Sequence, residues 1–397
     1  MVDNTKKSYK WVILAISFMF MLVFSISLQS LPPLFSRITE DIPFSNSQAG
    51  MLMGAYAIPG IILPFFIAFL SNKINNKMII NTALIIMIIG LTAFSLSNSF
   101  SMLLMYRIFT GIGATALVVL APLLITMFFE QENIGVAMGI FHAAVPFGTV
   151  VAANLFGVLG ERIKWRFTIL GIVAFVGMVL AISFFLLSLP KRDDNMGSNE
   201  DRQDSQGKFG SNWSLWLLAC IWTLANAQLL AYVTFAPQYF QKVGMSIQKA
   251  GLLSSFIMLF PIFLSPVVGI IIDKTGWKKQ LLLMGAVLMG ISFALIGKDT
   301  SNSVLWATIL GIGFTPIPVI VFILLPEGVE EHQMGMGLGV LTAASNLGIT
   351  IGPSAFGSLI DKTGGNFYFG FIVLALVSMG IILALAGFNG GRKDVHQ

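Results

Sequence analysis

Twelve long apolar stretches run through the chain, and they restrict its fold more than any other feature. Each is close to the roughly 20 residues that an α-helix needs to cross a bilayer. None shows the two-residue alternation of a membrane β-barrel strand, so helices are the expected element. We predict an all-α membrane protein with twelve transmembrane helices, at about residues 11–35, 47–70, 78–97, 101–129, 134–158, 168–189, 213–240, 249–272, 280–297, 302–325, 334–358 and 367–388.

Charged residues are scarce, since they make up 10% of the 397 residues whereas hydrophobic residues make up 56%. An ordinary soluble domain carries about 25% charged residues. A soluble fold of this length cannot hide so much apolar surface, because a large part of any folded surface faces water. The composition therefore excludes a soluble enzyme, a nucleic-acid-binding module and a disordered chain. We expect the lipid bilayer as surroundings and no nucleic acid as partner.

Basic residues in the connecting segments predict the orientation. If the N-terminus faces the cytoplasm, fourteen Lys and Arg lie in cytoplasmic segments and eight in outer loops, which is the bias that cytoplasmic loops show. We therefore expect a multi-pass protein of a prokaryotic cytoplasmic membrane, with both termini in the cytoplasm. A long polar stretch divides the spans six and six. It predicts an N-terminal bundle (1–189), a cytoplasmic linker (190–211) and a C-terminal bundle (212–397).

Glycines repeat between the two halves of the chain. Small residues let membrane helices approach closely, so a glycine repeat indicates two similar bundles. We expect two pseudo-symmetric six-helix bundles with a solute site near the midplane between them. The alternative is that glycine-rich spans align without a true repeat. Chance predicts about two matches at a shift of 200 residues, and seven pairs are found: Gly90/Gly290, Gly111/Gly311, Gly113/Gly313, Gly135/Gly335, Gly139/Gly339, Gly148/Gly348 and Gly157/Gly357.

The loop after the eighth span carries a G-x-x-x-D-K-x-G-x-K-K motif at residues 269–279. The motif resembles the signature of the major facilitator superfamily, and the resemblance extends over essentially the whole chain. It implies a twelve-helix transporter in which this loop latches neighbouring helices. In that role the Asp receives helix-end amides and the second glycine makes a tight turn. The candidate latch residues here are Gly269, Asp273, Lys274, Gly276 and Lys278.

The corresponding loop of the first half departs from this signature. Asn72 stands in place of the acid, and Asn75 replaces the turn glycine, although asparagine tolerates the left-handed conformation. Asn72 can still form hydrogen bonds, but without the gain that a charge provides. The candidate latch residues of this half are Asn72, Lys73 and Lys77.

The fourth span contains a single arginine within the stretch R-I-F-T-G-I-G at residues 107–113. This stretch resembles the R-x-x-x-G-x-G element of the same superfamily. A charged side chain inside a span is costly and is a functional-site candidate by default. We expect Arg107 to act in gating or solute binding, and Arg107→Ala to abolish transport while folding and membrane insertion survive. The alternative is that Arg107 satisfies backbone carbonyls, or Gln29 and Tyr56, on adjacent helices.

Two further sequence patterns refine the prediction. Glycine–proline elements at residues 139–148 and 348–357 predict helices that bend at proline and cross their neighbours closely at glycine. The stretch LPPLFSRITEDIPFSNSQAGMLMGAY, residues 31–56, resembles the branch of the superfamily that contains cyanate, nitroimidazole and related small-anion carriers.

Every Asp and Glu of the sequence lies in a loop, in a tail or at the end of a span. A buried cationic solute would therefore lack a counter-charge, so an anionic or small neutral solute is expected. Glu161 and Asp361, at the outer ends of spans 5 and 11, are expected to pair with Arg162 or Lys362 at the surface. His142, the only histidine in a span, is a candidate for proton coupling; the alternative is a hydrogen-bonded packing residue.

Polar residues at midspan depth are the candidates for the solute site. No nucleotide loop, metal cluster or nucleophile set occurs in the sequence, so no cofactor, no metal and no enzymatic activity are expected. We predict a monomeric secondary active transporter that moves a small solute by alternating access, with a coupling proton or counter-solute as a further partner. The alternatives are a multidrug/proton exporter of the same superfamily and a non-transporting membrane sensor or scaffold. The candidate binding or gating residues are Gln29, Tyr56, Arg107, Asn226, Tyr232 and Asn346.

Overall fold

The computed structural model describes residues 2–71, 73–129, 131–189, 213–329 and 334–388. The predicted linker 190–211 lies outside the described residues. The elements are α1 (Val2–Gln29), η1 (Pro32–Leu34), α2 (Phe35–Asp41), α3 (Asn46–Ala55), α4 (Pro59–Ser71), α5 (Asn76–Ser95), α6 (Phe100–Phe128), α7 (Gln131–Val151), η2 (Ala152–Phe156), α8 (Gly157–Arg162), α9 (Trp165–Leu186), α10 (Trp213–Lys242), α11 (Ile247–Thr275), α12 (Lys278–Ile296), η6 (Thr300–Asn302), α13 (Ser303–Phe314), α14 (Pro316–Gly328), α15 (Met334–Lys362) and α16 (Phe367–Gly387).

The predicted helical class is confirmed, because the described residues contain helices and no strand. They include twelve helical stretches long and apolar enough to cross a membrane. Several spans combine two elements: α1 continues into α2, α3 into α4, α7 into α8 and α13 into α14. Most of the spans begin at or a few residues before the predicted apolar run, and several of them, α5 and α9 among them, end a few residues before its predicted end.

Three of the spans are irregular at midlength. In the second span the helix stops at Ala55 and restarts at Pro59, because proline has no N–H to donate and disfavours helical conformation in the residue before it. The tenth span changes helix at Pro316 for the same reason. In the fifth span a π-helical segment, η2, follows α7. The helix in span 11 continues through Pro353, so the predicted proline position there does not end the helix.

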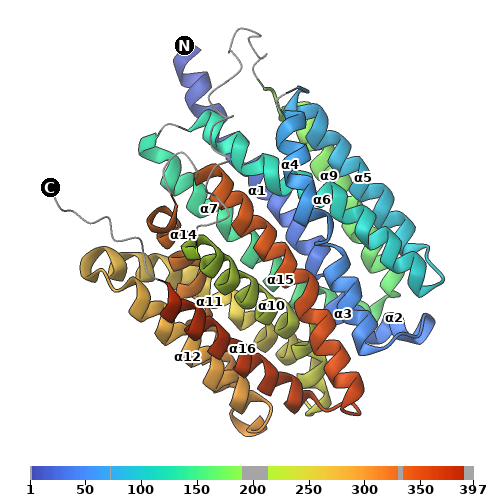
Figure 1. Cartoon of the computed structure of the whole chain (residues 1–397). Helices are drawn as coiled ribbons and strands as arrows, with labels where there is room; N and C mark the ends of the chain where they lie inside the picture. The colour runs from blue at the N-terminus through green and yellow to red at the C-terminus, as the bar shows by residue number, and fades with distance from the viewer. Residues whose placement is uncertain (1, 72, 130, 190–212, 330–333, 389–397) are drawn as a thin grey trace, which may run out of the picture.

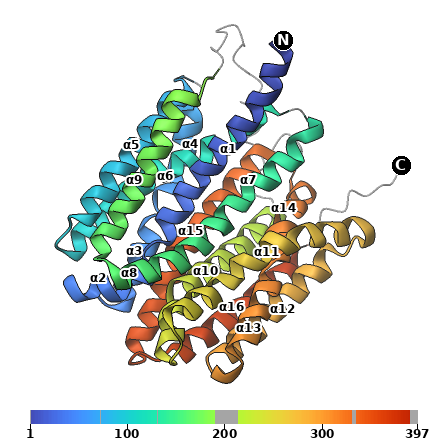
Figure 2. The same cartoon turned by 180° about the vertical axis from the view of Figure 1, so that it is seen from behind.

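The helices form two bundles, α1–α9 and α10–α16, which lie side by side (Figures 1 and 2). Between them α15 packs along α3 and α4, and α11 packs against α7 and η2. Several of the matched glycines make equivalent contacts in both halves. A Cβ at Gly111 would overlap the carbonyl oxygen of Tyr56, and a Cβ at Gly311 would lie 2.6 Å from that of Phe256. The repeat found in the sequence is therefore a repeat of helix contacts.

Two directions along the bundle are used below. The inner end is the end at which α1 begins and α16 ends, and the outer end is the opposite one (Figure 1). Helices α1, α10 and α15 run from the inner to the outer end, whereas α3, α4 and α11 run the other way. The predicted latch loops lie at the inner end.

Candidate functional site

At the outer end two glycines, which have no side chain, let the backbones of the two halves contact each other directly. A Cβ at Gly50 on α3 would overlap the carbonyl oxygen of Pro353 on α15. The equivalent Gly251 on α11 would place a Cβ 2.5 Å from the carbonyl oxygen of Ala153 in η2. These two contacts are related by the internal repeat. Since each needs a glycine, closure of the outer end depends on both.

Asp361, at the end of α15, bridges the halves at the same end. Its carboxylate accepts hydrogen bonds from the backbone N–H groups of Asn46 (3.1 Å) and Ser47 (2.7 Å) and from the Asn46 carboxamide (2.8 Å). These are amides of the first turn of α3, where an anion is favoured by unpaired donors and by the helix dipole. The predicted pairing of Asp361 with Lys362 is therefore wrong. Two backbone amides and one side-chain amide at the start of α3, on the other half, satisfy the carboxylate.

We expect Asp361→Ala to loosen this bridge. The loss of a charged cap typically costs about 0.5–2 kcal/mol, so hydrogen exchange at the Asn46 and Ser47 amides should accelerate several-fold. Glu161→Ala is the matched control, because Glu161 occupies the repeat-related position and makes no hydrogen bond among the described residues. Equal acceleration in both variants would show that Asp361 does not hold α3.

Arg107 lies on α6 with 2% of its surface exposed. Its guanidinium donates to the carbonyl oxygens of Leu52 (Nε, 3.2 Å), Ser27 (Nη1, 2.7 Å) and Leu28 (Nη2, 2.6 Å), and it stacks 4.5 Å from the Tyr56 ring centre. The three carbonyls belong to the last turns of α1 and α3, where helix carbonyls lack partners and carry partial negative charge. Two helix ends thus compensate the buried charge without a carboxylate.

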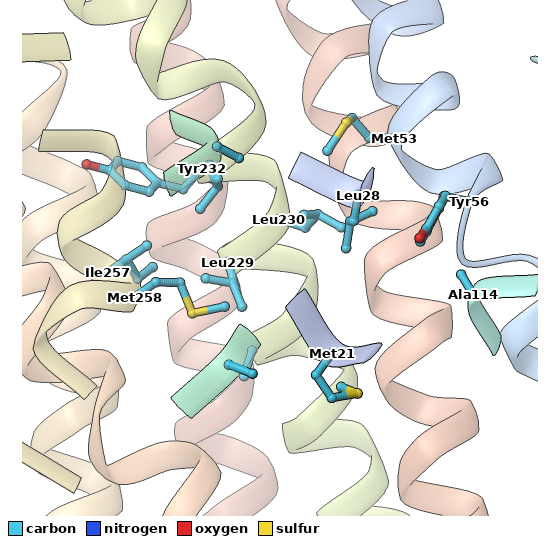
Figure 3. Close-up of a cluster of buried hydrophobic side chains, with 14 of the residues drawn as sticks. Met21, Leu28, Met53, Tyr56, Ala114, Leu229, Leu230, Tyr232, Ile257 and Met258 are labelled. Atoms are coloured by element: carbon cyan, nitrogen blue, oxygen red, sulfur yellow. The ribbon is translucent and has the colours of Figure 1, made fainter. Parts of the chain in front are cut away.

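An apolar layer separates the halves at midlength. Figure 3 shows Leu28 and Leu230 pointing toward one another from α1 and α10, with Met21 and Met258 nearer the inner end. Methionine side chains in this position can repack when helices shift. In this conformation the layer closes the seam between the halves on the inner side of the outer contacts.

Tyr56 and Tyr232 flank this layer, one in the N-terminal half and the other in the C-terminal half (Figure 3). Tyr56 donates to the Phe24 carbonyl oxygen (3.2 Å), and Tyr232 donates to the Leu253 carbonyl oxygen (3.2 Å). Each hydroxyl therefore links two helices of its own half rather than pointing into the seam. Sequence alone does not show which way a midspan hydroxyl points.

Asn226 and Asn346 lie on the inner side of the layer, on opposite faces of α15. Asn226 is one helical turn, about 5 Å, from Leu229 along α10, and a Cβ at Gly348 would lie 3.1 Å from its Cβ. Asn346, two residues from Gly348, packs its carboxamide against Gly60 of α4. Each Nδ2 donates one bond to its own helix, to the carbonyl of residue 222 or 342. Each carboxamide keeps an oxygen and an N–H for another partner.

The helix break in the second span connects the two clusters. Tyr56, at its start, stacks on Arg107, and Gly60, just beyond it, contacts Asn346. These contacts are only four positions apart in the sequence. A shift of α15 at Asn346 can therefore move Tyr56, and with it Arg107, through a single non-helical turn. This arrangement brings three of the six candidate residues into one connected set: Tyr56, Arg107 and Asn346.

Gln29 and His142 form no hydrogen bond with this set among the described residues. Gln29 is buried at the end of α1, and its Oε1 has no hydrogen-bond partner among the described residues. His142 is exposed on α7 and makes no hydrogen bond within the described part of the chain, which does not favour the packing alternative. Near it a Cβ at Gly139 would meet open space. Its coupling role stays a prediction.

The latch loop of the second half, between α11 and α12, has the glycine turn that the motif implies. Gly276 adopts a φ of 69° and ends α11 with a bond from its N–H to the Ile272 carbonyl, a left-handed conformation that favours glycine. Lys278 pairs with Glu327 and so joins α12 to α14. Asp273 and Lys274 are exposed, and Gly269 has open space beside it.

The first-half loop provides a different set of contacts. The ammonium group of Lys73 lies 4.4 Å from the ring centre of Phe69, and that of Lys77 lies 5.7 Å from that of Phe184. Asn75 caps α5 by accepting from the Lys77 amide. Asn72 lies outside the described residues, so its latch role stays a prediction.

Sequence reasoning missed two parts of this arrangement. One is the bridge from Asp361 to α3, although the capping box formed by Ser45 and Gln48 marks that helix start in the sequence. The other is the set of partners of Asn346, since nothing in a single sequence tells which helix faces Gly60. Both contacts join residues about 300 positions apart.

Comparison with known proteins identifies the family and the fold. The sequence model of the Major Facilitator Superfamily matches residues 13–353 and 231–393. A human lysosomal dipeptide transporter, MFSD1, is 23% identical over 90% of this chain and 82% of its own length. A probable nitrate transporter of Staphylococcus epidermidis, NarT, is 24% identical over 92% of both chains.

Solved structures show the same architecture. A bacterial homologue of the human lysosomal transporter Spinster, in an inward-facing and unoccupied conformation, superposes with a TM-score of 0.78 at 19% identity, over 96% of both chains. The nucleoside transporter NupG superposes with a TM-score of 0.77 at 14% identity, over 96% of this chain and 98% of its own. At these identities the superpositions establish the fold alone.

Proposed function

The chain belongs to the Major Facilitator Superfamily and is a membrane transporter, and on that premise we propose that its solute is a small anion. The observation that carries the proposal is the environment of Arg107. Within the described spans it is the only buried charged side chain, and its partners are neutral carbonyls. Its positive charge is therefore not cancelled by an acid, and it favours an anion nearby.

We propose that the anion binds on the inner side of the apolar layer. There the Asn346 carboxamide offers a neutral N–H donor on α15, beside Gly60 of α4. Neutral donors suit an anion that must also leave, since a direct ion pair would hold it too firmly. The helix break at Tyr56 would connect binding at Asn346 with the arginine.

The test is uptake by the purified protein in liposomes. We expect nitrate and small carboxylates to be taken up, and to raise the thermal unfolding temperature of the protein in detergent because a ligand of the folded state stabilises it. Asn346→Ala should reduce uptake at least tenfold, while Asn154→Ala, which removes another span asparagine bonded to its own helix, should not. Stabilisation by cationic drugs alone would favour the exporter alternative and overturn the anion proposal.

A dipeptide is a second candidate solute. The similarity to the lysosomal dipeptide transporter extends over most of the chain. A dipeptide has a terminal carboxylate for the carboxamide N–H groups of the site, but its amine would need an acceptor such as an asparagine oxygen. Competition by dipeptides against labelled nitrate in the same liposomes separates the two solutes.

For the topology, we propose that the inner end faces the cytoplasm and that the chain divides into the bundles 1–189 and 212–397. The excess of Lys and Arg in the inner segments supports this orientation. The outer end is then the one closed by Asp361 and the paired glycines. A solute would reach Asn226 and Asn346 from the cytoplasmic side in this conformation.

A further inference from the structure

A groove on the side of the N-terminal half is unrelated to the seam. It lies between α5 and α9, which pack together at the edge of the bundle away from the second half (Figures 1 and 2). Its volume is about 780 Å³, within the roughly 300–1,000 Å³ of ligand sites in proteins. Side chains such as Ile85 and Leu180 line its depth, and Lys77 lies at its inner mouth.

Lys77 provides an uncompensated positive charge at this mouth. Its ammonium group reaches from α5 to the Phe184 ring of α9, 5.7 Å away, and forms no ion pair with any described residue. The mouth also contains Asn75 and Met78, so the first turn of α5 faces it. The positive end of a helix dipole and a lysine favour the same ligand group, a phosphate.

One helical turn deeper, Asn81 continues the polar part of the groove. Its Oδ1 accepts a hydrogen bond from the Ser183 hydroxyl on α9 (2.8 Å). The carboxamide is thereby oriented, and its N–H groups stay available to an ester oxygen. Beyond it the lining is apolar, and Gly177 leaves open space where a side chain would stand.

We propose that this groove binds an anionic phospholipid of the inner leaflet. The phosphate lies at Lys77 and the start of α5, the ester region lies at Asn81, and an acyl chain runs over Gly177. A free phosphate would leave the apolar depth of the groove empty, whereas a lipid fills both parts. The polar mouth lies at the end of the bundle where headgroups of that leaflet lie, and basic pockets between helices bind such headgroups.

Native mass spectrometry of the full chain in detergent tests the proposal, with phosphatidylglycerol and phosphatidylcholine as probes. We expect Lys77→Gln to weaken phosphatidylglycerol binding about fivefold and to leave phosphatidylcholine binding unchanged. Gly177→Leu should abolish retention of both lipids by filling the groove. Gly171→Leu is the matched control on the same helix, because its Cβ also meets no atom within 4 Å but lies outside the groove.

Both leucine variants should fold, since leucine is the better helix former and neither side chain meets a neighbour. If Lys77→Gln is unstable, Lys77→Arg replaces it and should retain phosphatidylglycerol. The proposal is overturned if Lys77→Gln binds phosphatidylglycerol like the wild type, or if Gly177→Leu binds lipid like Gly171→Leu. Displacement of the lipid by inorganic phosphate alone would also overturn it.

Discussion

Replacement of Arg107 by alanine is expected to abolish uptake and also to destabilise the protein, by about 2–4 kcal/mol. The variant leaves the carbonyls of Leu28 and Leu52 without their side-chain donor inside the membrane, whereas that of Ser27 keeps the Ser30 hydroxyl. A buried carbonyl that loses its donor costs about 1–3 kcal/mol. Because these carbonyls end α1 and α3, the relative position of those helices should change too. We therefore expect the variant to be less stable than the wild type.

Two variants make this test specific. Arg107→Lys retains the charge but not the planar guanidinium with its several N–H donors. It should therefore recover part of the stability and little of the uptake. Arg166→Ala is the matched control, because Arg166 also donates to two helix-end carbonyls, Ser95 and Ser97, but at the surface. It should transport normally. Unchanged unfolding temperature and uptake in Arg107→Ala would refute both a structural and a functional role.

The second large effect is expected at the outer glycine contacts. Gly50→Val places a side chain where the Pro353 backbone lies, and no rotamer can avoid a backbone atom. Gly251→Val does the same at the repeat-related contact with Ala153. Overpacking costs about 1–3 kcal/mol, and the cost falls on the state closed at the outer end. Its population relative to the open state should fall about 5- to 150-fold.

Cross-linking measures this shift directly. The hydroxyls of Ser47 and Ser358 lie 2.8 Å apart across the seam, so cysteines at these positions should cross-link when the outer end is closed. In a Cys220→Ser background, Gly50→Val should suppress the cross-link and uptake together. Gly171→Val, in open space on α9, should leave both intact. Efficient cross-linking in Gly50→Val would mean that the contact tolerates a side chain.

The fold was predictable because each of its signals is local. Twelve spans follow from the length of the apolar runs, and the two bundles follow from the spacing of the glycines. The turn at Gly276 also follows from its neighbours, since only a glycine there fits the left-handed end of α11 easily. The charge that occupies the membrane interior, Arg107, is visible in the sequence as well.

The partners of these residues were not predictable from the same signals. Arg107 donates to carbonyls of α1 and α3. Asp361 was expected to pair with Lys362, but it accepts hydrogen bonds from α3 of the other half. Tyr232 has a suitable depth, yet its hydroxyl points to Leu253 and away from the seam. In each case the outcome depends on which helix faces which, and on the rotation of each helix about its axis.

By itself the sequence determined that this chain spans a membrane twelve times, that its halves repeat, and that one arginine lies inside. Those properties depend on transfer of residues from water to lipid and on close packing along one helix, which are additive and local. Only the tertiary structure decided that two helix ends hold the arginine, that Asn346 meets Gly60, and that α5 and α9 leave a groove beside Lys77. These depend on backbone ends and faces brought together from distant parts of the chain, and single-residue properties do not encode that pairing.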